Sequence, residues 1–238
     1  MEIWKNIERE MLSLYDERQA KLLIRFFKCG KGEYGEGDCF LGIRVPITRE
    51  IVKSHRKDLT QEDVLKLTES KWHEIRLAGF LGLVEIYKSA REDARREVVD
   101  NYLSILDRGN NWDLVDVIAP KILGDWLVTH PEDFNILYRL SEEEGNLWKQ
   151  RVSMVAGWML IRKGIYEPTL KLAEQFLTHK HDLMHKATGW MLREIGKRDQ
   201  NSLLKFLDSH AREMPRTMLR YAIEKLDEPL RQEFLRRK

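Results

Sequence analysis

The chain has 238 residues, of which 42% are apolar and 34% charged; this is the balance of a folded, soluble protein of one or two domains, and it excludes intrinsic disorder. Its longest uncharged, largely apolar run, residues 77–84, is far shorter than the roughly 20 residues of a transmembrane helix, and we expect no secretory signal because residues 1–6 lack a basic and an apolar segment. The two cysteines, Cys29 and Cys39, are too few for a disulfide framework and fit a reducing cytoplasm.

The two ends of the chain differ in charge. Residues 186–238 contain 13 Lys and Arg against 8 Asp and Glu, whereas residues 1–185 contain 28 against 31. The C-terminal end therefore carries +5 and the rest −3, although the whole chain carries only +2. A basic end is typical of proteins that bind a polyanion such as nucleic acid, but it also serves solubility, so charge alone leaves both explanations open.

Apolar residues recur at intervals of three and four almost throughout, as at Leu170, Ala173 and Leu177, and the alternating pattern of strands is hard to find. We therefore predict an all-α protein of about a dozen short helices, organised as one domain over residues 1–238. Residues 30–37 form a glycine-rich loop that is too irregular to bind phosphate. Helix starts are marked by Pro46, Thr60 with Asp63, Asp133, Pro168, Pro215 and Pro229, and helix ends or loops by Gly30, Gly145, Gly164 and Gly196.

Four tryptophans recur at similar intervals. Trp72, Trp112, Trp148 and Trp190 are separated by 40, 36 and 42 residues, and intervals near 40 are typical of two-helix solenoid repeats of the HEAT or armadillo type. We expect a right-handed superhelical solenoid of HEAT-like repeats. A second register competes with the first, because residues 157–160 (Gly-Trp-Met-Leu) recur as residues 189–192 at a spacing of 32, so the repeat is loose.

Three of these tryptophans are followed by an arginine, namely Arg76, Arg151 and Arg193, at a distance of three or four residues. Positions three or four apart share one face of a helix. Each pair is therefore expected either to present an indole and a guanidinium side by side, or to combine a tryptophan that anchors its helix pair with a solvated arginine. The spacing does not decide between these two interpretations.

Residues 110–116 are the sharpest candidate for a chemical site. Asparagine is a good N-cap, so a helix is predicted to begin at Trp112 or Asp113, with Asp113 as a candidate capping residue. Trp112 and Asp116 share a face, and the helix dipole should keep Asp116 ionised. An acidic residue at a helix start is usually structural. Beside an exposed tryptophan, and with Arg151 and Trp190 brought alongside by later repeats, Asp116 would instead supply a fixed negative charge between two aromatic faces and a cation.

Two further groups lie towards the C-terminus. His181 and His185 share a helical face with room for a metal, but no cysteine is near and Asp182 lies about 100° round the helix. For the cluster that they form with His179 we favour a structural or DNA-phosphate role, and we predict no metal site. The basic residues Arg216, Arg220 and Lys225 either extend a phosphate-binding wall or solvate the last helix pair.

Four segments of the chain resemble the AlkD family of DNA alkylation repair glycosylases, which are built from HEAT-like repeats. They are Phe40–Pro46, Asn111–Asp116, Leu147–Arg151 and Lys186–Glu194, and they occur in the family's order over most of the chain. The Trp-Asp-Leu-Val-Asp and Gly-Trp-Met-Leu-Arg-Glu pieces together are highly specific for this family.

The resemblance implies a role for each matching residue. Asp116 corresponds to the catalytic carboxylate, Trp112 and Trp190 to residues that contact the sugar and backbone at the lesion, and Arg151 to a residue that binds a nearby phosphate. These four residues make up the catalytic site that the resemblance implies.

Further residues are expected at the DNA. Arg44 and Pro46 match loop positions that approach the duplex opposite the lesion, although Arg44 replaces a neutral polar residue of the family. Asn111 stands where well-studied members have a second tryptophan, and the loop before Cys39 is longer; these departures bear on lesion preference more than on the chemistry. The remaining DNA-binding candidates are Trp148, Lys149, Lys186, Arg193, Arg216 and Arg220.

The implied activity is that of a monofunctional DNA glycosylase acting on double-stranded DNA. It would hydrolyse the N-glycosidic bond of cationic purines alkylated at N3 or N7, such as 3-methyladenine and 7-methylguanine, without base flipping and without a cofactor, and leave an abasic site. A fixed carboxylate stabilises the oxocarbenium character that develops on the sugar, indole faces attract cations, and a cationic purine departs without a general acid.

Two alternatives belong to other classes of protein. One is a non-catalytic HEAT-repeat protein that binds damaged or branched DNA, and the other is a protein-binding HEAT scaffold. Asp116 argues against both, because a pure phosphate binder has no use for a carboxylate facing a polyanion. We expect a monomer in the cytoplasm, at the nucleoid, with no membrane contact.

Overall fold

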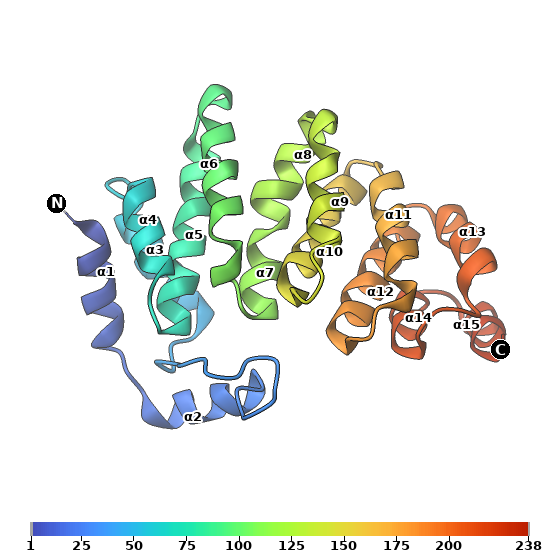
Figure 1. Ribbon diagram of the computed structural model, residues 1–238, viewed down its shortest axis with the longest axis horizontal. Helices are drawn as coiled ribbons and strands as arrows, with labels where there is room; N and C mark the ends of the chain where they lie inside the picture. The colour runs from blue at the N-terminus through green and yellow to red at the C-terminus, as the bar shows by residue number, and fades with distance from the viewer. Residues whose placement is uncertain (1, 238) are drawn as a thin grey trace. The chain divides into compact units, whose positions relative to one another are not determined.

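The computed structural model describes residues 2–237, and in this range it is helical without strands, which confirms the predicted all-α class (Figure 1). The helices before residue 110 are α1 (Ile3–Leu12), α2 (Glu17–Phe26), α3 (Val45–His55), α4 (Gln61–Thr68), α5 (His73–Ser89) and α6 (Glu92–Ser104). The later helices are α7 (Trp112–Ile118), α8 (Asp125–Thr129), α9 (Asn135–Ser141), α10 (Leu147–Arg162), α11 (Glu167–Gln175), α12 (Asp182–Gly196), α13 (Gln200–His210), α14 (Arg216–Ala222) and α15 (Glu228–Arg236). Shorter turns are the 3₁₀ segments Leu106–Arg108, Pro131–Phe134 and Phe176–Thr178 and a π-helical turn at Pro120–Gly124.

The chain packs as two compact units, the first ending at Leu114 and the second beginning at Val115. The boundary falls inside α7, so the helix that carries Trp112 and Asp116 begins in one unit and continues into the other. This division describes packing, and the single domain over residues 1–238 stays a prediction. Among the described helices none is long and apolar enough to cross a membrane.

The first unit is built around α5, which packs against α3, α4 and α6. The apolar run noted in the sequence lies in this helix, and its side chains are buried on every side, as expected for a helix that is apolar all round. The preceding α4 begins with the predicted cap: the Thr60 hydroxyl accepts from the Asp63 backbone N–H, and the Asp63 carboxylate accepts from the Thr60 backbone N–H. The start of α4 and the buried position of α5 were therefore predictable from local sequence signals.

The second unit repeats one packing arrangement. Helices α10, α12 and α14 contact one another in sequence, while α11 and α13 each pack against members of this row. Contact between every second helix is typical of stacked helical repeats. Gly157 of α10 and Gly189 of α12 permit close approach, because a Cβ atom at either would collide with Thr169 or with the Met218 carbonyl. Both repeated Gly-Trp-Met-Leu segments therefore mark close inter-helix contacts, although Gly157 meets the next helix, α11, and Gly189 meets α14.

The four tryptophans that recur near every 40 residues do not all occupy equivalent positions in their helices. Trp72 is the N-cap of α5, Trp112 is the first residue of α7 and Trp148 is the second residue of α10, so these three mark helix starts. Trp190 lies in the middle of α12, where its counterpart is Trp158 of α10. The spacing near 40 therefore holds for three tryptophans, and the competing spacing of 32 relates the other pair.

Candidate functional site

The helix that carries the candidate site begins where the sequence predicts, at Trp112. Asn111 is fully buried; its side-chain oxygen accepts from the Trp112 backbone N–H at 2.9 Å, and its amide donates to the Phe27 carbonyl at 3.4 Å. The expectation that Asp113 caps the helix is wrong, because the Asp113 carboxylate is directed to the Nε2 atom of His73 at 2.9 Å. Asp113 therefore binds His73 of α5 instead of capping its own helix.

Asp116 is held by Arg151 of α10. The guanidinium donates from Nε to Oδ1 and from Nη2 to Oδ2, both at 2.8 Å, in a bidentate pair. Because both carboxylate oxygens accept from the same guanidinium, Asp116 is in its anionic form. Its side chain remains 18% exposed, whereas that of Arg151 is 6% exposed. The pair thus presents a carboxylate of fixed orientation at the surface of the second unit.

The same arginine also contacts α12. Its Nη1 atom donates to the backbone carbonyl of Leu183 at 2.5 Å, in the first turn of the helix that carries Trp190. Arg151 therefore links Asp116 of α7 to the start of α12. Trp190 lies further along α12 and is half-buried.

The arginines of the other two predicted pairs, Arg76 and Arg193, are neither presented beside their tryptophans nor solvated. Arg76 is buried and donates to Asp38 at 2.7 Å and to Asn110 at 2.8 Å, so its guanidinium is neither presented beside Trp72 nor solvated. Arg193 is half-buried and forms an ion pair with Glu224. Both guanidinium groups bind carboxylates that are distant in the sequence. The spacing of residues along one helix cannot predict such partners.

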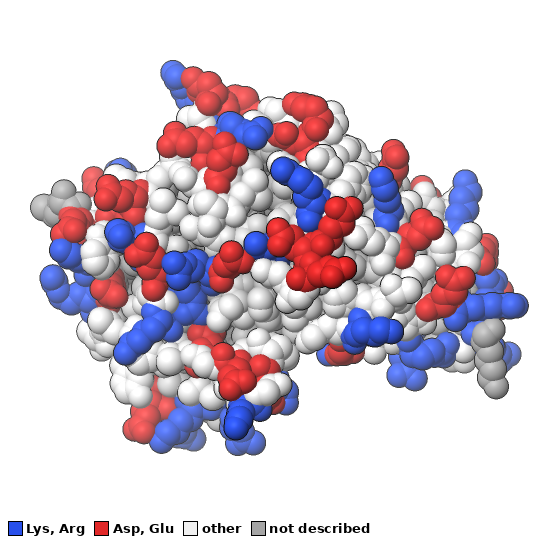
Figure 2. All heavy atoms as spheres, in the orientation of Figure 1, with Lys and Arg blue, Asp and Glu red and all other residues white. Residues whose placement is uncertain are grey.

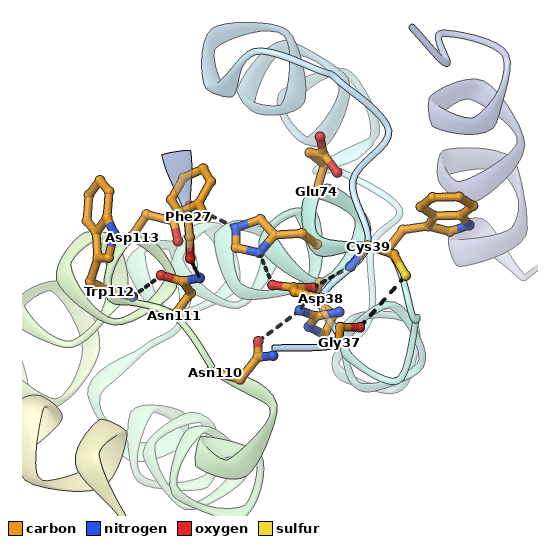
Figure 3. A network of polar contacts seen from close by, with 12 residues as sticks. Phe27, Gly37, Asp38, Cys39, Glu74, Asn110, Asn111, Trp112 and Asp113 are labelled. Carbon is orange, nitrogen blue, oxygen red and sulfur yellow. Dashed lines mark hydrogen bonds and ion pairs between the residues drawn. The ribbon is translucent and has the colours of Figure 1, made fainter. Parts of the chain in front are cut away.

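The first unit contains a buried charge network that the sequence did not indicate (Figure 3). The His73 imidazole lies between two carboxylates, with Nδ1 at 2.7 Å from Asp38 Oδ2 and Nε2 at 2.9 Å from Asp113 Oδ2. Arg76 binds the other oxygen of Asp38. The four side chains carry two negative and two positive charges when the imidazole is protonated, so the network is neutral.

The geometry fixes the charge state of His73. An ionised carboxylate only accepts hydrogen bonds, so two carboxylates facing the two ring nitrogens require a proton on each nitrogen. Burial alone would lower the pKa of His73, but the hydrogen bonds and charges of Asp113 and Asp38 outweigh it and raise the pKa to about 9. Hydrogen bonds and charge from His73, joined by Arg76, in turn lower the pKa of Asp38 against its burial.

The loop after Asp38 is anchored by a third buried carboxylate, that of Glu74. It accepts from the backbone N–H groups of Leu41, Gly42 and Ile43 at 2.8, 2.8 and 3.1 Å. Gly42 has φ +88°, and a Cβ atom there would lie 2.5 Å from the Asp16 carbonyl, so the turn that aims these donors requires glycine. Two neighbouring residues of α5 therefore hold this loop: His73 binds Asp38, and Glu74 binds residues 41–43.

Trp112 is half-buried in an aromatic group of the first unit. Its ring stacks on that of Phe27 with centroids 5.3 Å apart, and it meets Phe26 edge-on at 5.9 Å. Phe27 stacks in turn on Phe40 at 5.1 Å, and Phe40 stacks on the His73 ring at 4.4 Å. Phe26 is 62% exposed, so an apolar side chain stands in the open beside Trp112. Sequence reasoning missed this neighbour, although its helix, α2, has an apolar face of which only Ala20 is buried.

The predicted DNA-binding residues lie in varied surroundings. Arg44 and Pro46 are exposed at the start of α3, and Arg220 is exposed on α14. Lys186 pairs with Asp182 at 2.7 Å, Lys149 lies 3.7 Å from Glu143, and the Arg216 guanidinium donates to the Leu235 carbonyl at 2.9 Å. Trp148 is half-buried. Figure 2 shows basic side chains gathered over the helices near the C-terminus, in keeping with the charge of residues 186–238; the DNA-binding roles stay predictions.

The histidine cluster is engaged with its own segment. His181 Nδ1 accepts from the Leu183 backbone N–H at 3.1 Å and caps α12, while His179 Nδ1 accepts from the His181 backbone N–H at 3.0 Å. Burial and neighbouring histidines lower the pKa of His179, and burial lowers that of His181. Among residues 2–237, no group of three or more His, Cys, Asp or Glu side chains is arranged to hold a metal ion.

These observations define an all-helical repeat protein whose second unit presents an oriented, partly exposed carboxylate. The family model described as DNA alkylation repair enzyme matches residues 7–226, so the chain belongs to the DNA alkylation repair enzyme family. This confirms the family inferred from the four sequence segments and makes DNA the substrate class. Among solved structures, the chain is similar to a predicted DNA alkylation repair enzyme from Enterococcus faecalis, with 18% identity and a TM-score of 0.70 over 90% of this chain and 97% of that one. At this identity the likeness supports the fold, and the comparison with curated proteins finds no significant match.

Proposed function

We propose that the protein is a monofunctional DNA glycosylase that releases cationic N3- and N7-alkylated purines from duplex DNA. The observation that carries the proposal is the carboxylate of Asp116, partly exposed and oriented by two hydrogen bonds from Arg151, in a member of a family of DNA alkylation repair enzymes. A carboxylate that is held in one orientation and remains partly exposed is suited to stabilising positive charge on a bound substrate.

The chemistry is a hydrolysis at the anomeric carbon. The bond between C1′ and the purine nitrogen breaks, and its electron pair leaves with the purine and neutralises the alkylated ring. Water adds its oxygen to C1′ and releases a proton, which leaves an abasic sugar. Positive charge accumulates on the sugar as the bond breaks, and the Asp116 anion stabilises it without giving or taking a proton.

In this proposal Arg151 is a positioning residue. Its guanidinium is buried, and its donors are engaged by Asp116 and by the Leu183 carbonyl. Arg151 keeps the carboxylate ionised and fixes its direction before DNA arrives, so no reorganisation is needed during the reaction. The family resemblance assigns sugar and backbone contacts to Trp112 and Trp190, and we retain these roles, with the lesion left in contact with the protein surface rather than in a closed pocket.

The test is base release from DNA methylated at N3 of adenine and N7 of guanine, quantified by chromatography of the free bases. We expect the parent protein to release both bases. Asp116→Asn removes the charge with almost no change in shape and should reduce release by about 10²- to 10³-fold, the usual cost of losing one electrostatic stabiliser. Asp100→Asn is the matched control, because Asp100 is an exposed carboxylate on α6 that also pairs with an arginine, Arg96, and we expect it to release bases at the parent rate.

The outcomes separate the two classes of DNA-binding protein. Equal release by Asp116→Asn and the parent would remove Asp116 from the reaction. If the parent binds methylated duplex but releases no base above the spontaneous rate, the protein is a non-catalytic binder of damaged DNA, and the glycosylase proposal is wrong.

A further inference from the structure

Two adjoining hollows lie on the first unit, between α3 and the C-terminal half of α5. Their volumes are about 390 and 380 Å³, and they share the side chains of Glu85 and Lys88. Basic side chains outnumber acidic ones in the lining of both hollows. The basic residues are Arg49, Lys53, Arg56, Lys57 and Lys88.

Four of these cations are not neutralised by the protein. Lys88 pairs with Glu85 at 2.7 Å, but Arg49, Lys53, Arg56 and Lys57 are exposed and form no hydrogen bond or ion pair with any residue that the structure describes. Other exposed cations of this unit are of both kinds: Lys66, Arg91 and Arg96 pair with Glu69, Asp93 and Asp100, whereas Arg18 and Lys31, like the four in the hollows, form no ion pair with a described residue. The hollows therefore hold more positive than negative charge, and four of their cations have no ion-pair partner among residues 2–237.

The arrangement is set by the helix. Arg49 and Lys53 are four residues apart, and Arg56 and Lys57 follow three and four residues later, so all four project from one side of α3 and its C-terminal extension. Glu50 and Glu85 are the acidic residues of the lining, which leaves five cations against two anions. This spacing is visible in the sequence, but only the structure shows that α5 closes the other side of the hollows.

The lining selects a small, strongly charged group. No aromatic side chain lines either hollow, so nothing is available to stack a base, and the apolar members Val52 and Leu81 are buried. Lysine and arginine side chains recognise phosphate by charge and by their N–H donors. Two such hollows that share lining residues offer two adjoining positions for phosphate groups.

We propose that these hollows between α3 and α5 bind consecutive backbone phosphates of duplex DNA. The inference rests on the proposed function in one respect, that duplex DNA is the substrate. It assigns the first unit a contact surface of its own, made by residues other than Arg44 and Pro46. The contact is to phosphate alone, so it holds DNA of any sequence, damaged or intact.

The experiment measures binding of undamaged duplex as a function of salt concentration. The triple variant Lys53→Ala, Arg56→Ala, Lys57→Ala should flatten the plot of log binding constant against log salt by about two to three units of slope, since each lost phosphate contact removes about one. The control is the triple variant Lys66→Ala, Arg91→Ala, Arg96→Ala, which removes the same charge from exposed, ion-paired positions of the same unit. We expect its slope to change by less than one.

Two results would overturn the inference. Equal flattening by both triple variants would show that only net charge matters, and an unchanged slope in the first variant would show that DNA does not reach the hollows. Inorganic phosphate added at constant ionic strength distinguishes a free-anion site: if phosphate binds there and the DNA slope is unchanged, the site takes a small anion and the proposal is wrong. No base release is needed for any of these measurements, so a parent protein that shows the expected slopes but releases no base contradicts the glycosylase proposal alone.

Discussion

The two possible roles of Arg151 can be separated by one substitution. Its guanidinium is occupied by Asp116 and the Leu183 carbonyl, so Arg151→Met should cut base release by about 10²-fold or more through loss of carboxylate orientation. The salt dependence of DNA binding should stay at the parent value, because no phosphate contact is lost. Methionine keeps the aliphatic packing of the side chain, and far-UV circular dichroism checks that the variant folds.

Lys186 provides the comparison on the neighbouring helix. It is partly exposed and forms a surface ion pair with Asp182 one helical turn away, so we expect Lys186→Ala to lower the slope of the salt plot by about one. A loss of about one unit of slope in Arg151→Met would instead support the phosphate contact that the family resemblance implies. In that case the orienting role proposed above would not hold.

The buried imidazolium of His73 makes stability depend on pH in the alkaline range. Its pKa is about 9 in the folded chain and near 6.5 in an unfolded one, so the stabilisation is fully present below pH 6.5 and is lost as pH rises through 9. The shift corresponds to about 3 kcal/mol of unfolding free energy. Urea unfolding between pH 6 and 10 should show this loss in the parent.

Two measurements isolate the contribution of His73. His73→Gln should flatten the pH dependence, whereas His55→Gln, at a more exposed histidine that pairs with Glu10, should leave it as in the parent. Because the first variant leaves two buried carboxylates without their cation and is expected to be unstable, the imidazole is also titrated by NMR in the parent protein. An apparent pKa near 6.5 would contradict the charge state assigned here.

At the level of helices and loops, sequence signals worked where they act locally. The Thr60 and Asp63 cap, the start of α7 at Trp112 and the prolines at the first turns of α3, α11 and α15 all depend on a few adjacent residues. The buried network was not predictable in this way, because His73 takes its partners from 35 residues before and 40 residues after it. Asp113 shows the conflict directly: local sequence favours a cap, and a distant imidazolium prevails.

The glycine-rich loop offers a test of how closely these distant segments pack. A Cβ atom on Gly35 would lie 2.6 Å from the Phe27 carbonyl and 3.1 Å from the Asn111 amide, so Gly35→Ala should force α2 and the start of α7 apart. We expect a loss of about 1 to 3 kcal/mol in the free energy of urea unfolding. At Gly30 the added carbon would meet only the flexible side chain of Glu33, so Gly30→Ala is the control, and a similar loss in both variants would contradict the packing argument.

For the whole molecule, the tryptophan spacing and the family motifs predicted an all-helical repeat protein correctly, whereas the position of Trp190 shows that the repeat is not uniform. The basic residues of the chain also fall into two groups. Buried arginines hold carboxylates, as Arg76 holds Asp38 and Arg151 holds Asp116, whereas unpaired cations such as Lys53 and Lys57 lie at the surface. Counting charges along the sequence cannot separate these two groups, because only the structure shows which cations are buried.

The proposed site leads to a prediction about which lesions are removed. Asp116 is an anion and Arg151 holds its protons at any physiological pH, so neither donates a proton to a departing base. The rate should then depend on the charge that the lesion already carries: 7-methylguanine and 3-methyladenine should be released at least about 10²-fold faster than hypoxanthine or uracil, since general acid catalysis of that size is missing. In the proposed site the lesion stays at the protein surface, beside the partly exposed carboxylate of Asp116. Large substituents on N7 should therefore be tolerated better than by an enzyme that encloses a flipped base.

Single-turnover release from duplexes carrying a small N7 group, a bulky N7 group and a neutral lesion measures both effects. Efficient release of the neutral base, or rejection of every bulky cation, would indicate an enclosed pocket with its own acid and would contradict the role assigned to Asp116.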